Sequence, residues 1–261
     1  MRKIAFLLIS MILISGCTSN SEPTKAGAIA SVYFVADTPR GFKLFSEQRE
    51  FPETENLGQD VISDLVSGKI VPLDPNYVNL WGAKNTVNSI TASDSVATID
   101  LGTISLNVGA ESEERAIEQI VWTFLEINTA IKAVRFTVNG NTVESFAGHV
   151  DTTREFTKSP GYDVLNPLQI SSITEGETLT NPITIFGQAC TFEANVYWRL
   201  SQDGNLVKDG STTAGAACPE RSAWSVALDT LDPGSYRFEV IEYSAEDGSL
   251  FAIDDKNFSI K

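Results

Sequence analysis

Residues 110–138 read AESEERAIEQIVWTFLEINTAIKAVRFTV, and this stretch joins the strongest helix signal of the chain to a strand. Apolar side chains recur at intervals of three and four residues, which is the spacing of one buried helix face, so a helix is predicted over residues 110–128. Acidic side chains in its first turn favour a helix start there, because the helix dipole is positive at that end. Residues 134–138 read as a strand, and Asn139-Gly140 is a hairpin signal that returns the chain into a second strand at 142–146.

The rest of the first half alternates strands and helices in the same way. A β-branched and aromatic strand is expected at residues 31–35, followed by a loop. Apolar residues from Leu57 onward recur every four residues and predict a helix that ends at Gly68. Residues 88–91 and 96–101 read as a hairpin. The alternation is typical of an α/β or α+β fold.

Composition changes after this half. Residues 149–166 are polar, lack periodicity and are interpreted as a domain linker with few groups able to anchor it. Beyond them no helix signal remains, and frequent turns separate short strands, which indicates an all-β immunoglobulin-like sandwich. Trp198 lies in the third strand, where such folds bury a tryptophan, and Tyr236 has the position of a tyrosine corner. Seven strands are expected, at residues 168–173, 183–187, 194–200, 206–211, 223–228, 236–243 and 257–261.

The N-terminus has the pattern of a bacterial lipoprotein signal. Arg2 and Lys3 precede an apolar run that closes on Ile14-Ser15-Gly16-Cys17, which resembles a lipobox. The run would rise only about 16 Å as a helix, roughly half of a bilayer core, so a membrane span is not expected. The remaining alternative is an ordinary secretory signal with a coincidental cysteine. We expect residues 1–16 to be a signal peptide and Cys17 to carry diacylglycerol.

A polar tether, residues 17–30, would then lift the first domain, residues 31–148, off the membrane, with the sandwich at 167–261. The chain has 19 basic and 34 acidic residues and a formal net charge of -15. Such a charge repels phosphates, so nucleic-acid binding is excluded as a function class.

The other two cysteines are Cys190 and Cys218, and a disulfide is the default for such a pair in an oxidising compartment. No Cys-x-x-Cys or His-x-x-x-His spacing exists, so neither a metal nor a redox cofactor is expected. The single histidine, His149, lies in a polar segment, where a Ser-His-Asp or Cys-His site finds no support.

Other candidate site residues have structural interpretations that compete with functional ones. Asp100 lies inside a strand and is interpreted as an outward or turn-capping carboxylate rather than a catalytic one. Asp203-Gly204-Asn205 and Asp247-Gly248-Ser249 lack the acidic spacing of an EF-hand and are interpreted as turns rather than calcium loops. Neighbouring strand residues Tyr197 and Trp198 must point to opposite faces, one into the core and one outward. Trp81 is the best candidate for an exposed glycan contact, although packing in the core is favoured.

Several short stretches of both halves recur in a fixed order in known proteins. They are VYFV (32–35), DLVSG (64–68), ATIDL (97–101), QIVWT (119–123) and VRFTVNG (134–140) in the first half, and NPITIFGQA (181–189) and FEANV (192–196) in the second. The first set resembles the GerMN domain of bacterial sporulation and germination proteins over residues 31–148. The second set resembles the immunoglobulin-like domain that follows GerMN in many envelope proteins.

The resemblance implies an α/β fold related to the ring-building modules of secretion and sporulation machines, which are non-catalytic and act in assembly. It also implies work at the cell envelope, but it does not imply spores. Cys190 and Cys218 depart from the family as a whole and look like a lineage-specific staple. We therefore expect a lipid-anchored, non-enzymatic protein on the extracytoplasmic side of the membrane, with envelope proteins, peptidoglycan or copies of itself as partners. A glycan-binding module and a wall hydrolase with two convergent carboxylates are the alternatives.

The lipobox generates the first prediction. Replacing the thiol in Cys17→Ala removes the only atom that can accept diacylglycerol, so lipid labelling should be abolished and the protein should leave the membrane fraction. Metabolic labelling with a fatty acid and Triton X-114 partitioning measure both effects. Unchanged partition of the variant into the detergent phase would show that Cys17 is not the anchor.

Overall fold

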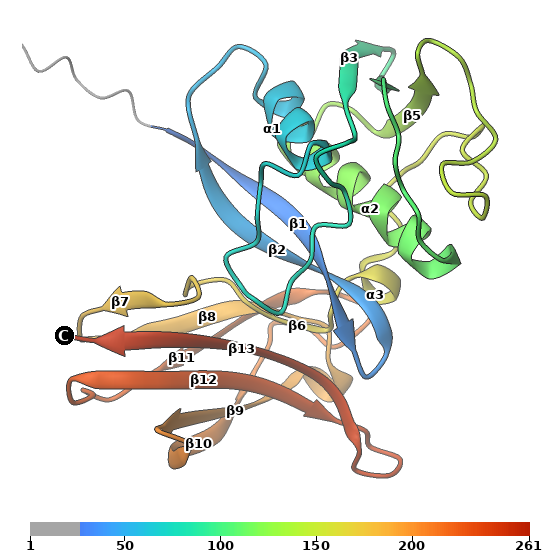
Figure 1. Cartoon of the computed structure of the whole chain (residues 1–261). Coiled ribbons are helices and arrows are strands. Elements are labelled where there is room, and N and C mark those ends of the chain that lie inside the picture. The colour runs from blue at the N-terminus through green and yellow to red at the C-terminus, as the bar shows by residue number, and fades with distance from the viewer. Residues whose placement is uncertain (1–26) are drawn as a thin grey trace, which may run out of the picture.

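The structure is a computed structural model that describes residues 27–261, so Cys17, the expected signal peptide and most of the expected tether lie outside the described residues. The first part of the chain forms a long hairpin and a separate three-stranded sheet, with two helices between them (Figure 1). Its elements are β1 (Ala28–Thr38), β2 (Gly41–Phe51), α1 (Leu57–Val66), β3 (Val87–Ser93), β4 (Val96–Leu101), α2 (Ala110–Ile127) and β5 (Ala133–Val138).

The central helix α2 organises this part because nearly all of its faces are covered. Its predicted stripe of Ile117, Ile120 and Phe124 packs into the main core with side chains from β1, α1, β4 and β5. The opposite face carries Trp122, which packs against Tyr33 of β1. Strand β4 pairs antiparallel with β3 and parallel with β5. A parallel pair needs a long crossover, and α2 supplies it.

Two expectations for the first part are wrong. Residues 41–51 were expected to be a loop, but β2 pairs with β1 over its whole length. Its charged side chains hide the strand pattern because they bind other segments: Lys43 donates to the carbonyl of Asp163, and Glu47 accepts from the N–H groups of residues 73 and 74. Residues 142–146 do not return as a strand: after the turn at Asn139-Gly140, the backbone N–H of Val138 donates to the carbonyl of Asn141 and pairing stops.

The carboxylate of Glu113 explains where residues 145–150 go instead. Glu113 lies in the first turn of α2 and is fully buried. Its Oε1 accepts hydrogen bonds from Ser145 Oγ at 2.8 Å, Phe146 N at 2.9 Å and Ala147 N at 2.8 Å. Its Oε2 accepts hydrogen bonds from His149 N at 2.8 Å and Val150 N at 3.2 Å. This loop therefore satisfies its backbone on one carboxylate rather than on a neighbouring strand.

The second part is a sandwich of a five-stranded sheet, ordered β10-β9-β12-β13-β7, and a three-stranded sheet, ordered β11-β8-β6 (Figure 1). All seven expected strands are present, and the short β7 is additional. The strands are β6 (Leu168–Ile170), β7 (Glu177–Leu179), β8 (Thr184–Ala189), β9 (Asn195–Gln202), β10 (Asn205–Thr213), β11 (Ser222–Ala227), β12 (Gly234–Tyr243) and β13 (Leu250–Ile260).

Three details of the sandwich agree with the sequence. Trp198 is buried and stacks on Phe238 in the core. The hydroxyl of Tyr236 donates to the carbonyl of Asp232 at 2.9 Å, which is the bond of a tyrosine corner. Cys190 and Cys218 form a disulfide, with their Cα atoms 4.4 Å apart. Strand β9 begins later than expected, because residues 192–194 form a short 3-10 turn, η1 (Phe192–Ala194).

The segment from residue 149 to 166 is anchored, contrary to the expectation that few groups could hold it. Phe156 is buried and exchanges two backbone hydrogen bonds with Val134 of β5. The short helix α3 (Gly161–Val164) and the next residue bring Val164 and Leu165 against α2 and the β1–β2 hairpin. Asn166 is buried as well. The domain boundaries themselves stay a prediction.

A buried lysine joins the two parts. Lys256 of β13 is 5% exposed, and its Nζ donates to Asp74 Oδ2 at 2.7 Å, to the Tyr77 hydroxyl at 2.8 Å and to Asp254 Oδ1 at 3.0 Å. Asp74 and Tyr77 come from the loop between α1 and β3, so the cluster spans both parts. Asp254 is held in turn by the backbone N–H of Ile170 at 2.6 Å.

Hydrogen bonds to backbone carbonyls extend this junction. Gln169 Nε2 donates to the carbonyl of Ser46 in β2 at 2.8 Å. Asn166 Nδ2 donates to the carbonyl of Ile253 at 3.1 Å. Arg221 Nη1 donates to the carbonyl of Asn166 at 2.7 Å. The junction is therefore formed by hydrogen bonds between charged and polar groups. These bonds hold the two parts in one fixed arrangement.

The electrostatics of the cluster favour the charged lysine. Burial opposes the charge on Lys256, but the carboxylates of Asp254 and Asp74 outweigh burial and hold its pKa above the ordinary value. A raised lysine pKa stabilises the folded state fully at any pH below the unfolded pKa, near 10.4, and the effect is lost only at higher pH. The stabilisation that comes from the charge of Lys256 is therefore constant through the neutral range, while burial raises the pKa of its partner Asp254.

We predict that Asp74→Asn destabilises the protein by roughly 3 kcal/mol, because it leaves Lys256 buried with half of its compensating charge. Urea unfolding measures the loss, which should be equal at pH 6 and pH 8. The matched control is Asp64→Asn, which breaks an exposed ion pair with Lys69 of similar length, 2.8 Å, and should change the unfolding free energy far less because solvent screens that pair. Equal losses in the two variants would contradict a structural role for the cluster.

Glu113 generates a prediction with the opposite pH dependence. Burial opposes its charge, but the N–H and O–H donors of residues 145–149 prevail and lower its pKa. A lowered carboxyl pKa stabilises the folded state above the unfolded value, near 4.3, and the effect is lost as pH falls through the folded value. At pH 7, Glu113→Gln should cost roughly 3 kcal/mol, because an amide replaces the shared charged acceptor.

The acid limb of the stability profile checks this assignment. The wild-type protein and Glu113→Gln should converge in unfolding free energy as pH falls below 4, while Glu114→Gln should follow the wild type throughout. Glu114 is the control because it is the next residue of the same helix and its side chain is 56% exposed. A constant gap between wild type and Glu113→Gln at all pH values would argue against the charge of Glu113.

Candidate binding face on the C-terminal sheet

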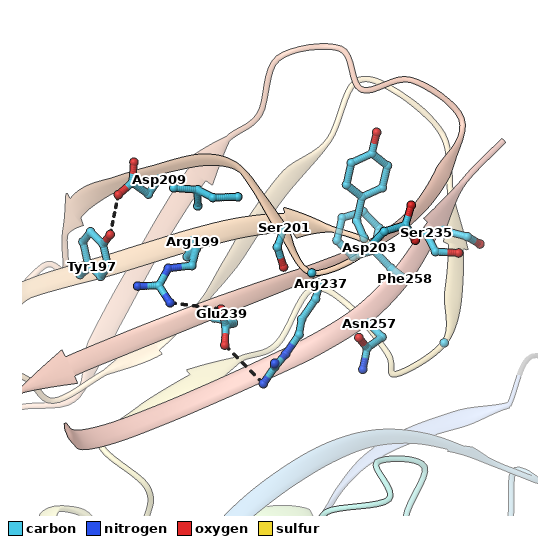
Figure 2. A pocket seen from close by; sticks show the side chains of 15 residues that line it. Tyr197, Arg199, Ser201, Asp203, Asp209, Ser235, Arg237, Glu239, Asn257 and Phe258 are labelled. Carbon is cyan, nitrogen blue, oxygen red and sulfur yellow. Dashed lines mark hydrogen bonds and ion pairs between the residues drawn. The ribbon is translucent and has the colours of Figure 1, made fainter.

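The outer face of the five-stranded sheet is hollowed and polar (Figure 2). The hollow has a volume of about 960 Å³ and lies over strands β9, β10, β12 and β13. Strand alternation explains its lining, because every second residue of a strand points away from the core. In β9, Trp198 and Leu200 point inward, whereas Tyr197, Arg199 and Ser201 line the hollow. In β12, Phe238 points inward between Arg237 and Glu239.

The pairing register places opposite charges side by side. Arg199 lies opposite Asp209 of β10 on one side and opposite Glu239 of β12 on the other. Glu239 in turn lies opposite the like-charged Asp255 of β13, and Arg237 offsets this repulsion because it contacts both carboxylates. Cross-strand pairs of opposite charge stabilise a sheet modestly, so this lattice is compatible with a purely structural role as well as with binding.

The geometry of the lattice orients two guanidinium groups over the hollow. Arg237 Nε donates to Asp255 Oδ2 at 2.9 Å, and its Nη2 lies 3.3 Å from Glu239 Oε1. Arg199 Nη1 lies 3.9 Å from Glu239 Oε2 (Figure 2). The two arginine side chains are 37% and 46% exposed, so solvent screens these pairs and each adds little to stability. A guanidinium has five N–H donors, more than these partners occupy at Arg237.

Hydrogen bonds also fix the protonation of the face. The bond to the Asp255 carboxylate raises the pKa of Arg237, and the bond to Asp209 raises the pKa of Tyr197. The Tyr197 hydroxyl donates to Asp209 Oδ2 at 2.5 Å. At neutral pH the face therefore presents charged guanidinium groups and a neutral phenol. These groups suit carboxylate, phosphate or hydroxyl ligands.

The same contacts weigh against hydrolysis at this face. A glycosidase needs one carboxyl group as acid and another as base or nucleophile, both free to reach the substrate. Here Asp209 accepts from Tyr197, and Glu239 and Asp255 are engaged by Arg237. Within residues 27–261 no group of three or more His, Cys, Asp or Glu side chains could hold a metal ion.

The structure shows which of the aromatic side chains considered for glycan binding are exposed and which lie in the core. Trp81 is buried, and its Nε1 donates to the carbonyl of Ala116 at 2.8 Å, so it is a core residue. Trp198 is in the core and Tyr197 points outward, as predicted. Tyr197 lies 6.3 Å from Tyr243 with an angle of 47° between the rings, so these two do not form a coplanar platform for a sugar.

The remaining candidates have structural roles. Asp100 Oδ1 accepts hydrogen bonds from Thr137 Oγ1 and Gly140 N, both at 2.7 Å, which confirms the turn-capping interpretation. His149 is exposed, and its described contact is the backbone bond to Glu113. Asp203 and Gly204 have positive φ in the tight turn between β9 and β10, which is a hairpin geometry.

Sequence reasoning missed Arg199 and Arg237. The signal that could have found them is the polar residue at every second position of Tyr197-Trp198-Arg199-Leu200-Ser201 and of the strand around Phe238. A strand that alternates in this way has one solvent face, and two such strands in one sheet place their cations together.

Between residues 27 and 261, no helix is long and apolar enough to cross a membrane.

Each half of the chain matches a known protein family over most of its length. Residues 31–144 match the Germane family, described as "Sporulation and spore germination". Residues 167–249 match the Gmad2 family, described as "Immunoglobulin-like domain of bacterial spore germination". These matches confirm the resemblance inferred from the sequence and the fold class of both halves.

Solved structures with low sequence identity were also found. A candidate lipoprotein from Clostridium perfringens is 24% identical, with 51% of this chain and 89% of that chain covered and a TM-score of 0.36. The first GerMN domain of the sporulation protein GerM from Bacillus subtilis is 18% identical, with coverages of 50% and 98% and a TM-score of 0.42. The tandem GerMN domains of that protein are 15% identical, with coverages of 78% and 62% and a TM-score of 0.43. No curated protein matched the sequence.

Proposed function

We propose that this chain, which carries a sporulation and spore germination domain followed by an immunoglobulin-like domain of bacterial spore germination, is a non-catalytic binding protein of the cell envelope. The observation that carries the proposal is the pre-oriented face of Arg199, Arg237 and Tyr197 on a sheet that is locked to the first domain through Lys256. The family descriptions, which name processes rather than reactions, support it.

Rigidity supports a binding role. The buried junction fixes the sheet face relative to the β1–β2 hairpin, so a partner that contacts both would not have to order them first. Association normally loses affinity to the ordering of loops and side chains, and pre-organisation reduces that loss. The cross-strand ion pairs act in the same way on a smaller scale, because they limit the rotamers of the two arginines before a ligand arrives.

A protein of the envelope is the partner class that we favour. The hollow mixes cations with Asp209 and Glu239, and a mixed lattice recognises a surface of complementary charges better than a single small anion. Copies of this chain, which carries an excess of carboxylates, are included among the candidates. The anchor proposed at Cys17 would hold the domain pair at the membrane, where a high local concentration makes weak contacts effective.

Peptidoglycan is the second candidate partner, and a specific observation favours it. The two guanidinium groups and the Tyr197 phenol offer donors over one hollow, and wall polymers present both carboxylates and hydroxyls. Against it stands the tilted Tyr197–Tyr243 pair, which gives no flat aromatic surface.

The test compares an Arg199→Ala/Arg237→Ala double variant with the wild type. Chemical crosslinking in native cells should trap envelope proteins with the wild type, and the double variant should lose most of the trapped product. The matched control is Arg135→Ala, which breaks an exposed arginine–carboxylate pair with Glu155 in the first domain and should change nothing.

Two readouts separate the alternatives. Sedimentation of the purified mature protein with isolated cell wall, lost in the double variant, would replace the protein partner with peptidoglycan. Hydrolysis of peptidoglycan by the wild type, lost on Glu239→Gln, would overturn the non-catalytic proposal. Crosslinking that is unchanged in the double variant would remove this face from consideration.

A further inference from the structure

A second pocket lies where the β1–β2 turn, α3 and the sandwich meet. It has a volume of about 660 Å³ and shares no lining residue with the hollow of the sheet face. Its walls are mostly apolar and include the Cys190–Cys218 disulfide, Phe251 of β13 and Pro167. Because its lining comes from both parts of the chain, the pocket depends on the junction being formed.

Two aromatic side chains at this pocket are exposed to an unusual degree. Phe192 is 64% exposed and Tyr162 is 48% exposed. Phe192 lies in η1, where the next two residues, Glu193 and Ala194, have φ of 55° and 57°. Two successive non-glycine residues in the left-handed region are strained. The chain thus holds a phenylalanine outward at an energetic cost, and exposed apolar groups that are costly to maintain mark binding sites.

Glu242 is a polar residue of this pocket. One of its carboxylate oxygens accepts a hydrogen bond, and the other has no partner among the described residues. Its Oε1 accepts the backbone N–H of Phe192 at 2.8 Å, which fixes the strained turn. Its Oε2 is buried and has no hydrogen-bond partner among the described residues. Burial raises the pKa of Glu242, against the opposing effects of the Phe192 N–H and Arg40. A buried acceptor without a partner is costly, and a ligand that donates an N–H would relieve that cost.

The charges around the pocket indicate a cationic ligand. Its lining carries the carboxylates of Asp163, Glu193 and Glu242 and the single guanidinium of Arg40. Arg40 lies 4.2 Å from the centre of the Phe251 ring, so it is held against the wall. The chain as a whole has a net charge of -15, which adds attraction for a basic partner at long range.

We infer that this pocket, beyond the proposed sheet face, is a docking site for a partner polypeptide that inserts an apolar or aromatic side chain beside a lysine or arginine. The inserted side chain packs against Phe192 and Tyr162. The adjoining cation donates to the free oxygen of Glu242. The mode needs no movement of the domains, because the walls are already in place.

The probes are two blocked dipeptides, acetyl-Phe-Lys-amide and acetyl-Phe-Glu-amide. They are titrated into the mature chain from residue 17, with Cys17→Ala so that no lipid is attached, and amide shifts are followed by NMR. The lysine peptide should perturb residues of the pocket and bind roughly fivefold more tightly than the glutamate peptide, the effect of one partly screened charge interaction. Equal binding of both peptides, or perturbations confined to the Arg199 face, would overturn the inference.

Two variants separate the contribution of the Glu242 charge to peptide binding from the contribution of the apolar wall. Glu242→Gln keeps an oxygen for the Phe192 N–H but replaces the free acceptor with a donor, so the preference for lysine should disappear. Phe192→Ala should weaken both peptides, whereas Phe186→Ala, an exposed phenylalanine of β8 outside the pocket, should leave them unchanged. Retention of the lysine preference in Glu242→Gln would contradict the role of that carboxylate, and the spectra themselves report whether each variant folds.

Discussion

The buried amine of Lys256 is the constraint on which the arrangement of this protein depends. A buried lysine must be surrounded by carboxylates and hydroxyls, and here they come from two places far apart in sequence, residues 74–77 and Asp254. An apolar junction would tolerate small slides between the domains, but the hydrogen bonds that one nitrogen donates to Asp74, Tyr77 and Asp254 allow a single geometry. Buried ion clusters are poor sources of net stability but can specify one arrangement, and this is how we interpret the cluster.

Many of the acidic side chains of this chain have a structural role. Part of the carboxylate excess is structural, because several acidic side chains accept hydrogen bonds from loop backbone N–H groups that have no strand or helix partner. Glu113 holds residues 146–150, and Glu47 accepts from Leu73 and Asp74 and so positions the carboxylate that meets Lys256. Glu111 accepts from Phe42 at the β1–β2 turn. Loops that would otherwise need strands are fastened by single side chains.

Local patterns predicted the elements that depend on local physics. The helix at residues 110–127, the seven strands of the sandwich and the tyrosine corner at Tyr236 each have a periodicity or a turn signal within a few residues. Strand β2 was missed because its alternation is broken where Lys43 and Glu47 bind segments outside the hairpin. The returning strand at 142–146 was predicted wrongly, because a carboxylate more than thirty residues earlier binds the N–H of Phe146 and those of the residues that follow it.

The candidate site likewise combines features that local sequence patterns predict with features that depend on long-range contacts. Strand alternation alone predicts that Tyr197 and Trp198 face opposite sides of the sheet. That Arg199 and Arg237 lie near each other depends on the pairing of β9 with β12, which no local sequence pattern contains. The pocket at Glu242 is lined by residues of both domains and of the segment between them. It could not be predicted, because that segment was interpreted from its sequence as an unanchored linker. Long-range contacts, rather than local propensities, made the difference.

The position of Lys256 near the end of β13 also has a consequence for the order of assembly. The first domain can form its core from residues 32–156, but Asp74 and the Tyr77 hydroxyl meet Lys256 only once β13 is available. During synthesis from the N-terminus, this contact waits for about 180 further residues. The carboxylate of Asp74 therefore lacks its lysine until the last strand of the sandwich is made, although Leu165 and Gln169 can already meet β2.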